Sequence, residues 1–411
     1  MGDEVTYTPS DAQYSRSDMH LRMKRPTPLS TSLSHLWSKT RDADDAPRGD
    51  ATSAEADSAA AGSSAAEGVG LRDAGPRTPG ATPGDTPAET PAATPENGRQ
   101  PNTSAPTEQA FDPASMSSPA SLDETPLARE IAQLTRRRAA LAGDVLPLPS
   151  QTRVLTIANQ KGGVGKTTTT VNLAAALAHA GARVLVIDLD PQGNASTALG
   201  VDHRADTPSI YDVIIEGESM ADVLQQSPEC DTLFCVPATI HLAGAEIELV
   251  TLTGREHRLR AALESFLSSV SDPFHYVFID CPPSLGLLTI NAFVAANEVV
   301  IPIQCEYYAL EGLTQLLNNI SLIEQHLNPR LKVSTILLTM YDSRTNLANE
   351  VAAEVRQHFP DKVLTTAIPR SVRISEAPSY GQTVISYDSN SAGALSYREA
   401  AAEMARRGAP Q

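Results

Sequence analysis

The sequence has few cysteines, no long apolar run and no leader-like start. Its four cysteines, Cys230, Cys235, Cys281 and Cys305, have the spacing of neither a disulfide framework nor a zinc ribbon, so we expect free thiols in a reducing compartment. No run of about 18 apolar residues occurs, which argues against a membrane-spanning helix. The first residues lack an apolar core followed by a small-residue cleavage site, so no secretory signal is expected. These absences predict a cytoplasmic protein.

Basic side chains are also scarce. The 32 Lys and Arg residues face 49 Asp and Glu, which gives a net charge of -17 and an isoelectric point near 4.9. This balance excludes a generally basic coat for nucleic acid. The excess of acidic over basic side chains is already present in residues 1–125, which hold 19 acidic and 10 basic side chains. The same residues hold 14 of the 30 prolines.

Apolar side chains are almost missing from the first third of the chain. Residues 42–120 contain only four of Val, Leu, Met and Phe, too few to offset the entropy of ordering the segment. We therefore predict that 1–125 is a disordered Pro/Ala/Thr-rich arm. Within it, residues 14–41 carry six basic side chains and the only tryptophan, Trp37. This stretch is a solvated tail, a docking motif for a polar or division scaffold, or a weak contact for DNA or anionic membrane.

Residues 126–142 show an imperfect apolar stripe that predicts a short helix starting at Pro126. Arg136 to Arg138 lie in it and could touch phosphate, although a solvated face is the plainer interpretation. We expect 126–150 to form this helix and a connector, followed by a compact domain over 151–407. There, apolar strands at 154–158, 183–187, 274–279, 298–303 and 333–339 alternate with helices at 167–180, 285–296, 310–327 and 346–359. That order predicts an α/β fold, a doubly wound, mostly parallel sheet with helices on both faces.

The segment Gln160-Lys-Gly-Gly-Val-Gly-Lys-Thr-Thr168 joins the first strand to the first helix, which is the context of a phosphate-binding loop. Its glycines allow a tight turn that points backbone N–H groups inward, and the helix start adds positive potential. Lys166 would reach the β- and γ-phosphates, and Thr167 would place its hydroxyl on Mg²⁺. Position 160 is Gln where the ordinary motif has Gly, and a second lysine, Lys161, brings more positive charge than one triphosphate needs locally.

This loop resembles the deviant Walker A loop of the ParA/MinD group of P-loop ATPases. In that group the extra lysine reaches across a dimer interface to the partner's nucleotide, which implies this role for Lys161. The resemblance implies ATP and Mg²⁺ as ligands and an ATP-dependent homodimer. The nucleotide contacts that it implies in the loop are Lys161, Gly162, Gly163, Val164, Gly165, Lys166, Thr167 and Thr168.

Two carboxylates follow the second strand in Val186-Ile-Asp-Leu-Asp-Pro-Gln-Gly-Asn194. Residues two apart on an extended chain point to one side, and the carboxyl end of a parallel strand faces the ligand crevice. Asp190 is well placed to orient an attacking water or to bind Mg²⁺. The segment resembles switch I of ParA proteins, which implies that Asp190 supports hydrolysis and that Asp188 helps to hold Mg²⁺. Alternatively, Asp188 only caps the turn.

Asp280 ends the apolar strand of Tyr276-Val-Phe-Ile-Asp-Cys-Pro-Pro-Ser284, which fits a Walker B residue that holds Mg²⁺ through water. The Cys-Pro-Pro turn resembles the family's switch II, and Cys281 is not expected to bind metal because no second ligand lies at suitable spacing. Catalysis is thus assigned to Lys161, Lys166 and Asp190, and Mg²⁺ to Thr167, Asp188 and Asp280.

The similarity extends from about Arg153 to Met404 and is of the Soj-like chromosomal ParA type. It implies that the adenine base is bordered by Met340, Tyr341, Asp342, Pro369 and Arg370. No Asn-Lys-x-Asp guanine signature occurs, which also favours ATP. The resemblance does not cover residues 1–125.

Residues 330–373 are locally basic, with seven Lys and Arg against four Asp and Glu. The family implication is nonspecific binding of double-stranded DNA by the ATP dimer, and hence association with the nucleoid. No aromatic platform for single strands accompanies these charges. The candidate DNA contacts are Arg330, Lys332, Arg356, Arg370 and Arg373, and a solvated charged face is the alternative for each.

We therefore expect an Mg²⁺-dependent ATP hydrolase that acts as a dimerisation switch in chromosome or plasmid partitioning, stimulated by a centromere-binding, ParB-like partner. The alternative is a MinD-like or scaffold-recruited regulator of cell division or polar positioning that does not depend on DNA. Residues 397–411 are dominated by alanine and lack the bulky apolar side chains of a membrane-inserting tail, so no membrane contact is expected there. A nitrogenase-reductase-like enzyme is disfavoured because Cys281 and Cys305 do not stand in cluster-ligand contexts.

Overall fold

Seven strands form one sheet in the order β3-β4-β2-β5-β1-β6-β7. The computed structural model describes residues 126–143 and 145–408, so the predicted arm and its 14–41 motif lie outside the described residues. In chain order the strands are β1 (Arg153–Ile157), β2 (Val184–Asp188), β3 (Gln225–Gln226), β4 (Leu233–Val236), β5 (Tyr276–Asp280), β6 (Glu298–Gln304) and β7 (Lys332–Thr339).

β1 is central and pairs in parallel with β5 and β6, and every other pairing is parallel except that of β3 with β4. The predicted mostly parallel sheet is thus confirmed, with each of its five expected strands within two residues of its expected bounds. β3 and β4 were not predicted, because β3 has two polar residues and β4 only four residues, too short to show a period.

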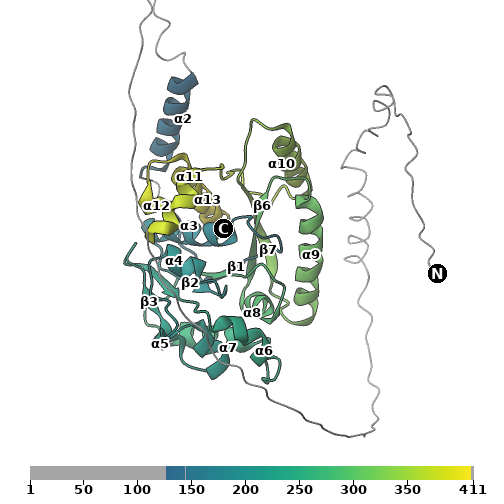
Figure 1. The fold of residues 1–411 in the computed structure, drawn as a ribbon. Helices are drawn as coiled ribbons and strands as arrows, with labels where there is room; N and C mark the ends of the chain where they lie inside the picture. The colour runs from purple at the N-terminus through teal and green to yellow at the C-terminus, as the bar shows by residue number, and fades with distance from the viewer. Residues whose placement is uncertain (1–125, 144, 409–411) are drawn as a thin grey trace, which may run out of the picture. The chain divides into compact units, whose positions relative to one another are not determined.

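The longer helices cover both faces of the sheet (Figure 1). α3 (Lys166–His179) packs on β1, β2 and β5 and carries α13 (Ala392–Arg407) on its outer side. On the other face α8 (Leu287–Ala295) packs on β1, beside α7 (Arg258–Ser269) and α9 (Ala309–His326). Shorter or peripheral helices are α4 (Asn194–Ala198), α5 (Met220–Val223), α6 (Leu242–Leu249), α10 (Asn346–His358), α11 (Val372–Glu376) and α12 (Val384–Tyr387).

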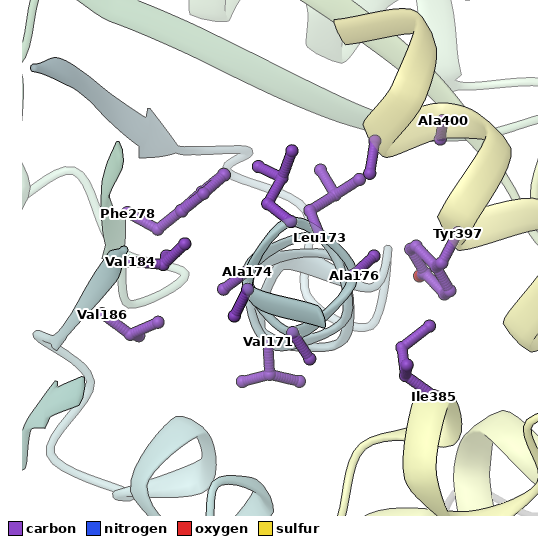
Figure 2. Packing of buried hydrophobic residues seen from close by; sticks show 14 of the residues in the cluster. Val171, Leu173, Ala174, Ala176, Val184, Val186, Phe278, Ile385, Tyr397 and Ala400 are labelled. Carbon is purple, nitrogen blue, oxygen red and sulfur yellow. The ribbon is translucent and has the colours of Figure 1, made fainter. Parts of the chain in front are cut away.

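The core around α3 explains why this helix is rich in alanine. Its small side chains let β-strand residues such as Val184 and Phe278 approach on one side and Tyr397 of α13 on the other (Figure 2). Leu173, with no exposed surface, contributes roughly 1.5–3 kcal/mol of burial free energy. α13 contains much of the C-terminal segment considered for membrane contact, and Ala400, Met404 and their neighbours are buried within the domain.

The expected helix over 126–142 forms as α2 (Pro126–Leu141) and packs on α13 (Figure 1). Leu141 packs against the main core, and Leu146 in the following connector is buried. The helix preceding the domain is therefore attached to it by apolar contacts.

Candidate active site

The loop between β1 and α3 forms an open cradle at the carboxyl end of the sheet. Gly163 and Gly165 have φ of 74° and 87°, a left-handed region that favours glycine. Gly165 precedes α3, and no side chain caps the first N–H groups of this helix. A Cβ on Gly162 or Gly163 would meet no atom within 4 Å, so the space in front of the loop is empty of protein. Uncapped N–H groups beside open space suit a phosphate group.

A threonine at the end of strand β7 holds this loop. Thr339 Oγ1, buried, donates a hydrogen bond to the Val164 carbonyl at 2.8 Å. We expect Thr339→Val, which preserves the side-chain shape, to leave that carbonyl unpaired and to lower the free energy of unfolding by about 1–3 kcal/mol. Urea denaturation measures this. Thr251→Val is the control, because its exposed hydroxyl bonds the Glu248 carbonyl where water can replace it, and its effect should stay within about 0.5 kcal/mol. Equal losses in both variants would refute a special role for Thr339.

The two loop lysines lie in different environments. Lys166 is buried, and burial lowers the pKa of its ammonium group, with Asp280 the main opposing charge. Lys161 instead is 40% exposed, and its Nζ lies 2.5 Å from Glu306 Oε2 on the segment after β6. Gln304 Nε2 donates to the other oxygen of Glu306 at 2.5 Å. Lys161 is thus held by its own chain's Glu306, a partner that the sequence analysis did not identify because 145 residues separate the two.

Asp280 lies at the end of β5, between β1 and β2. Its Oδ1 accepts a hydrogen bond from Thr170 Oγ1 at 2.9 Å, whereas its buried Oδ2 has no partner. Burial, reinforced by the charge of Asp188, raises the pKa of Asp280 to about 8. A buried carboxylate oxygen without a partner beside a phosphate-type cradle fits a group that reaches Mg²⁺ through water.

Asp188 faces Asp280 across the β2–β5 pairing, but its oxygens are occupied. Oδ1 accepts from the Asp190 amide at 3.1 Å, and Oδ2 accepts from both the amide and the hydroxyl of Ser196 at 2.9 and 2.7 Å. Burial raises its pKa to about 6, against these hydrogen bonds. These contacts match the turn-capping role that the sequence left open for Asp188, and its Mg²⁺ role remains a prediction.

Asp190, two residues after Asp188, is 9% exposed, and its Oδ1 accepts a hydrogen bond from the Gln192 amide at 3.1 Å. The described residues contain no group of three His, Cys, Asp or Glu side chains that could hold a metal by themselves. Mg²⁺ is usually bound through one or two carboxylates together with substrate phosphates and water.

The predicted border of the adenine base is brought together from two segments. The Tyr341 amide donates to the Ile368 carbonyl at 2.9 Å, and Tyr341 forms a β-bridge with Pro369. Met340 has φ of 49°, and a Cβ placed on Gly165 would lie 3.9 Å from its Cε, so Met340 borders the cradle. Asp342 is engaged by the Arg344 guanidinium at 2.8 and 2.7 Å, which holds the pKa of its carboxyl down at about 2.

The structure divides the basic region that the sequence treated as one face. Arg330 and Lys332 lie at the amino end of β7, where Arg330 is 3.5 Å from Glu264. Arg370 and Arg373 follow Pro369, which pairs with Tyr341 just beyond the carboxyl end of β7. β7 has eight residues and spans about 26 Å, so this pair lies far from Arg330 and Lys332. Arg356 lies on α10 and donates to the Thr365 carbonyl. The five candidates therefore do not form one continuous patch.

Comparison with known proteins decides the family. A family model described as an AAA domain matches residues 152–333. The sporulation initiation inhibitor protein Soj of Bacillus subtilis is 52% identical over 256 residues, which are 62% of this chain and 99% of Soj. The chromosome partitioning protein ParA of Myxococcus xanthus is 50% identical over 259 residues, or 63% of this chain and 90% of that protein. The chain belongs to the Soj/ParA family of chromosome-partitioning ATPases.

The resemblance drawn from the sequence motifs is thereby confirmed, and this ParA-family chain is a P-loop ATP hydrolase. Among solved structures, a cobyrinic acid a,c-diamide synthase from Mycobacterium smegmatis with bound ADP and magnesium is 41% identical. It has a TM-score of 0.52 and covers 61% of this chain and 93% of that one, in agreement with the P-loop fold.

The structure also bears on the expectations for the cysteines and for membrane-spanning helices. All four cysteines are free, and burial raises the pKa of the Cys281 thiol to about 12, which makes it unreactive. Its Sγ lies 3.0 Å from Thr156 Oγ1, in a structural contact. Among the residues that the structure describes, no helix is long and apolar enough to cross a membrane.

Proposed function

We propose that this ParA-family ATPase is a dimerisation switch for chromosome or plasmid partitioning, operated by ATP and Mg²⁺. One observation carries the proposal: the second lysine of the loop, Lys161, is accessible and held by Glu306, whereas Lys166 alone is buried beside the carboxylates. A cation that the chain's own nucleotide site does not enclose is available to a second subunit. The switch domain would extend over 151–407, after the 126–150 helix and connector.

Each site residue then has a task. The uncapped N–H groups of the loop and Lys166 bind the phosphates, and the segment from Met340 to Asp342 with Pro369 and Arg370 borders the base. Thr167 and Asp280 would hold Mg²⁺, which neutralises developing charge on the phosphates when bound. Asp190, which belongs to switch I and is almost fully buried, orients the attacking water. Lys161 of each subunit leaves Glu306 and contacts the nucleotide of its partner.

The ATP dimer binds double-stranded DNA nonspecifically, in the cytoplasm at the nucleoid, and a ParB-like centromere-binding partner stimulates hydrolysis and so releases it. Of the five basic candidates, Arg370 and Arg373 follow Pro369, which pairs with Tyr341 beyond the carboxyl end of β7, the end of the sheet that also holds the phosphate-binding loop. A dimer doubles the number of phosphate contacts, which makes binding steeply dependent on salt.

The test measures binding to nonspecific duplex DNA with ATP, ADP and no nucleotide across a salt series, for wild type and Lys161→Ala. We expect binding only with ATP, weakening steeply with salt, and its loss in Lys161→Ala although ATP is still bound through Lys166. If wild type binds no DNA in any nucleotide state, the partitioning switch is refuted and the scaffold-recruited regulator takes its place. In that case the 14–41 motif becomes the first segment to test for a scaffold.

A further inference from the structure

The helix α2 is an addition to the ParA-family domain. The match to the family model begins at residue 152, after α2 has ended at Leu141. Soj is matched over 99% of its length by 256 residues of this chain, so the remaining residues of the chain have no counterpart in Soj. What α2 does is therefore not a property that the family supplies.

α2 has a defined place on the domain rather than being attached only by its connector. Arg137 donates to both oxygens of Glu399 on α13, at 2.8 and 2.5 Å, and to Ser396 Oγ at 2.9 Å. Leu141 adds an apolar contact at the end of the helix. Arg137 thus fixes the helix to α13, and Arg136 and Arg138, one residue to either side of it, lie on its two flanks.

α2 is strongly basic in a protein that is acidic overall. The helix contains Arg129, Arg136, Arg137 and Arg138 but a single acidic residue, Glu130. The side chains of Arg129, Arg136 and Arg138 are exposed. Within the described part of the chain, none of these three forms an ion pair with a carboxylate, whereas most other exposed arginines do.

A hollow of about 510 Å³ lies where α2 meets α13 and the end of α3. Arg138, His179 and Arg398 line it, together with apolar and uncharged residues, and no carboxylate is among them. Beside this lining, Glu229 Oε1 is 3.7 Å from His179 Nε2. A concave surface with cations and no carboxylate in its lining attracts an anion such as a phosphate group.

This basic surface adjoins Arg373, one of the candidate DNA contacts. Arg138 donates a hydrogen bond to the carbonyl of Asn390, in the turn that leads into α13. Asp388, two residues earlier in the same turn, lies 3.5 Å from the Arg373 guanidinium. α2 packs on α13, which in turn contacts α11 and α12 (Figure 1).

We propose that α2 is a second DNA-contacting surface, in which Arg136 and Arg138 bind backbone phosphates of the duplex that Arg373 also contacts. This inference rests on the proposed DNA binding of the ATP dimer. Backbone contacts of this kind carry no sequence information, so α2 raises affinity for any duplex. Each phosphate neutralised adds about 0.9 to the slope of log affinity against log salt, and the dimer presents every contact twice.

The test compares four forms of the full chain, with ATP and nonspecific duplex DNA across a salt series. Arg136→Gln/Arg138→Gln removes two charges, and Arg136→Lys/Arg138→Lys keeps them on a different side chain. Arg204→Gln/Arg260→Gln is the control, since it removes two accessible arginines, on the loop after α4 and on α7, that already pair with Asp202 and Glu264. All variants retain Arg137 and the whole nucleotide site, and unchanged ATP affinity with unchanged helical circular dichroism verifies the fold.

We expect the glutamine variant to bind DNA at least about tenfold more weakly near 0.1 M salt, with a slope smaller by about 2 to 4. The lysine variant and the control should both stay close to wild type. The inference is overturned if the glutamine variant keeps the wild-type slope, if the lysine variant fails as the glutamine variant does, or if the control loses as much. Absence of ATP-dependent binding in wild type would instead refute the proposed function itself.

Discussion

Replacing Asp190 by alanine is expected to slow ATP hydrolysis by about 10²- to 10⁴-fold, the range over which a positioned proton acceptor or water-orienting carboxylate acts. Asp190 suits this task because it is only 9% exposed and its Oδ1 is fixed by the Gln192 amide at 3.1 Å. ATP binding should persist, since Lys166 and the loop amides are untouched. Single-turnover hydrolysis and equilibrium ATP binding, measured on the same preparation, separate the two effects.

Two comparisons make the Asp190 result specific. Asp190→Asn can still accept the hydrogen bond from Gln192 but lacks the charge, so it should be slow as well. Asp202→Ala removes an exposed carboxylate paired with Arg204 and should leave the rate unchanged. A rate within about threefold of wild type in Asp190→Ala would remove this residue from the catalytic set, because effects of that size are common for indirect changes.

The parts of the site that the sequence predicted are those in which one short segment contains all the information. The loop from Lys161 to Thr168 stands between a buried strand and a helix, so its position at the carboxyl end of the sheet follows from chain order alone. Asp280 is similar, because a carboxylate that ends an apolar strand next to β1 must lie near the loop. The bounds of the five expected strands followed from apolar runs in the same way, whereas β3 and β4 were too short to show one.

What the sequence did not predict depends on contacts between distant segments. The contact of Lys161 with Glu306 joins residues that no period relates. Asp188 accepts hydrogen bonds from the amide and hydroxyl of Ser196, eight residues later in the chain. The sequence does not show this contact, so it left open whether Asp188 caps the turn or helps to hold Mg²⁺. The basic residues from Arg330 to Arg373 are near one another in sequence. They lie at the two ends of β7, and an extended strand places its ends far apart.

The position of Lys161 bears directly on how the dimer would work. Its ion pair with Glu306 has both partners about half exposed, at 40% and 46%, so it is worth at most about 1 kcal/mol. A cation supplied by a second subunit accelerates phosphoryl transfer by a factor of about 10³ to 10⁵, which corresponds to several kcal/mol and so exceeds the energy of the ion pair. A dimer can therefore withdraw Lys161 from Glu306 at little cost. We expect Lys161→Ala to hydrolyse ATP about 10³- to 10⁵-fold more slowly while still binding it.

Mixing two inactive proteins distinguishes action on the partner's nucleotide from action on the chain's own. In a dimer of Lys161→Ala with Asp190→Ala, the first subunit keeps Asp190 and receives Lys161 from the second, so one of the two sites is complete. An equimolar mixture should then regain about a quarter of wild-type turnover, provided that subunits exchange freely. If Lys161 acts within its own subunit, neither site is complete and the mixture stays inactive. Mixing Asp190→Ala with the double variant Lys161→Ala/Asp190→Ala controls for contamination, because no pairing in it restores a site.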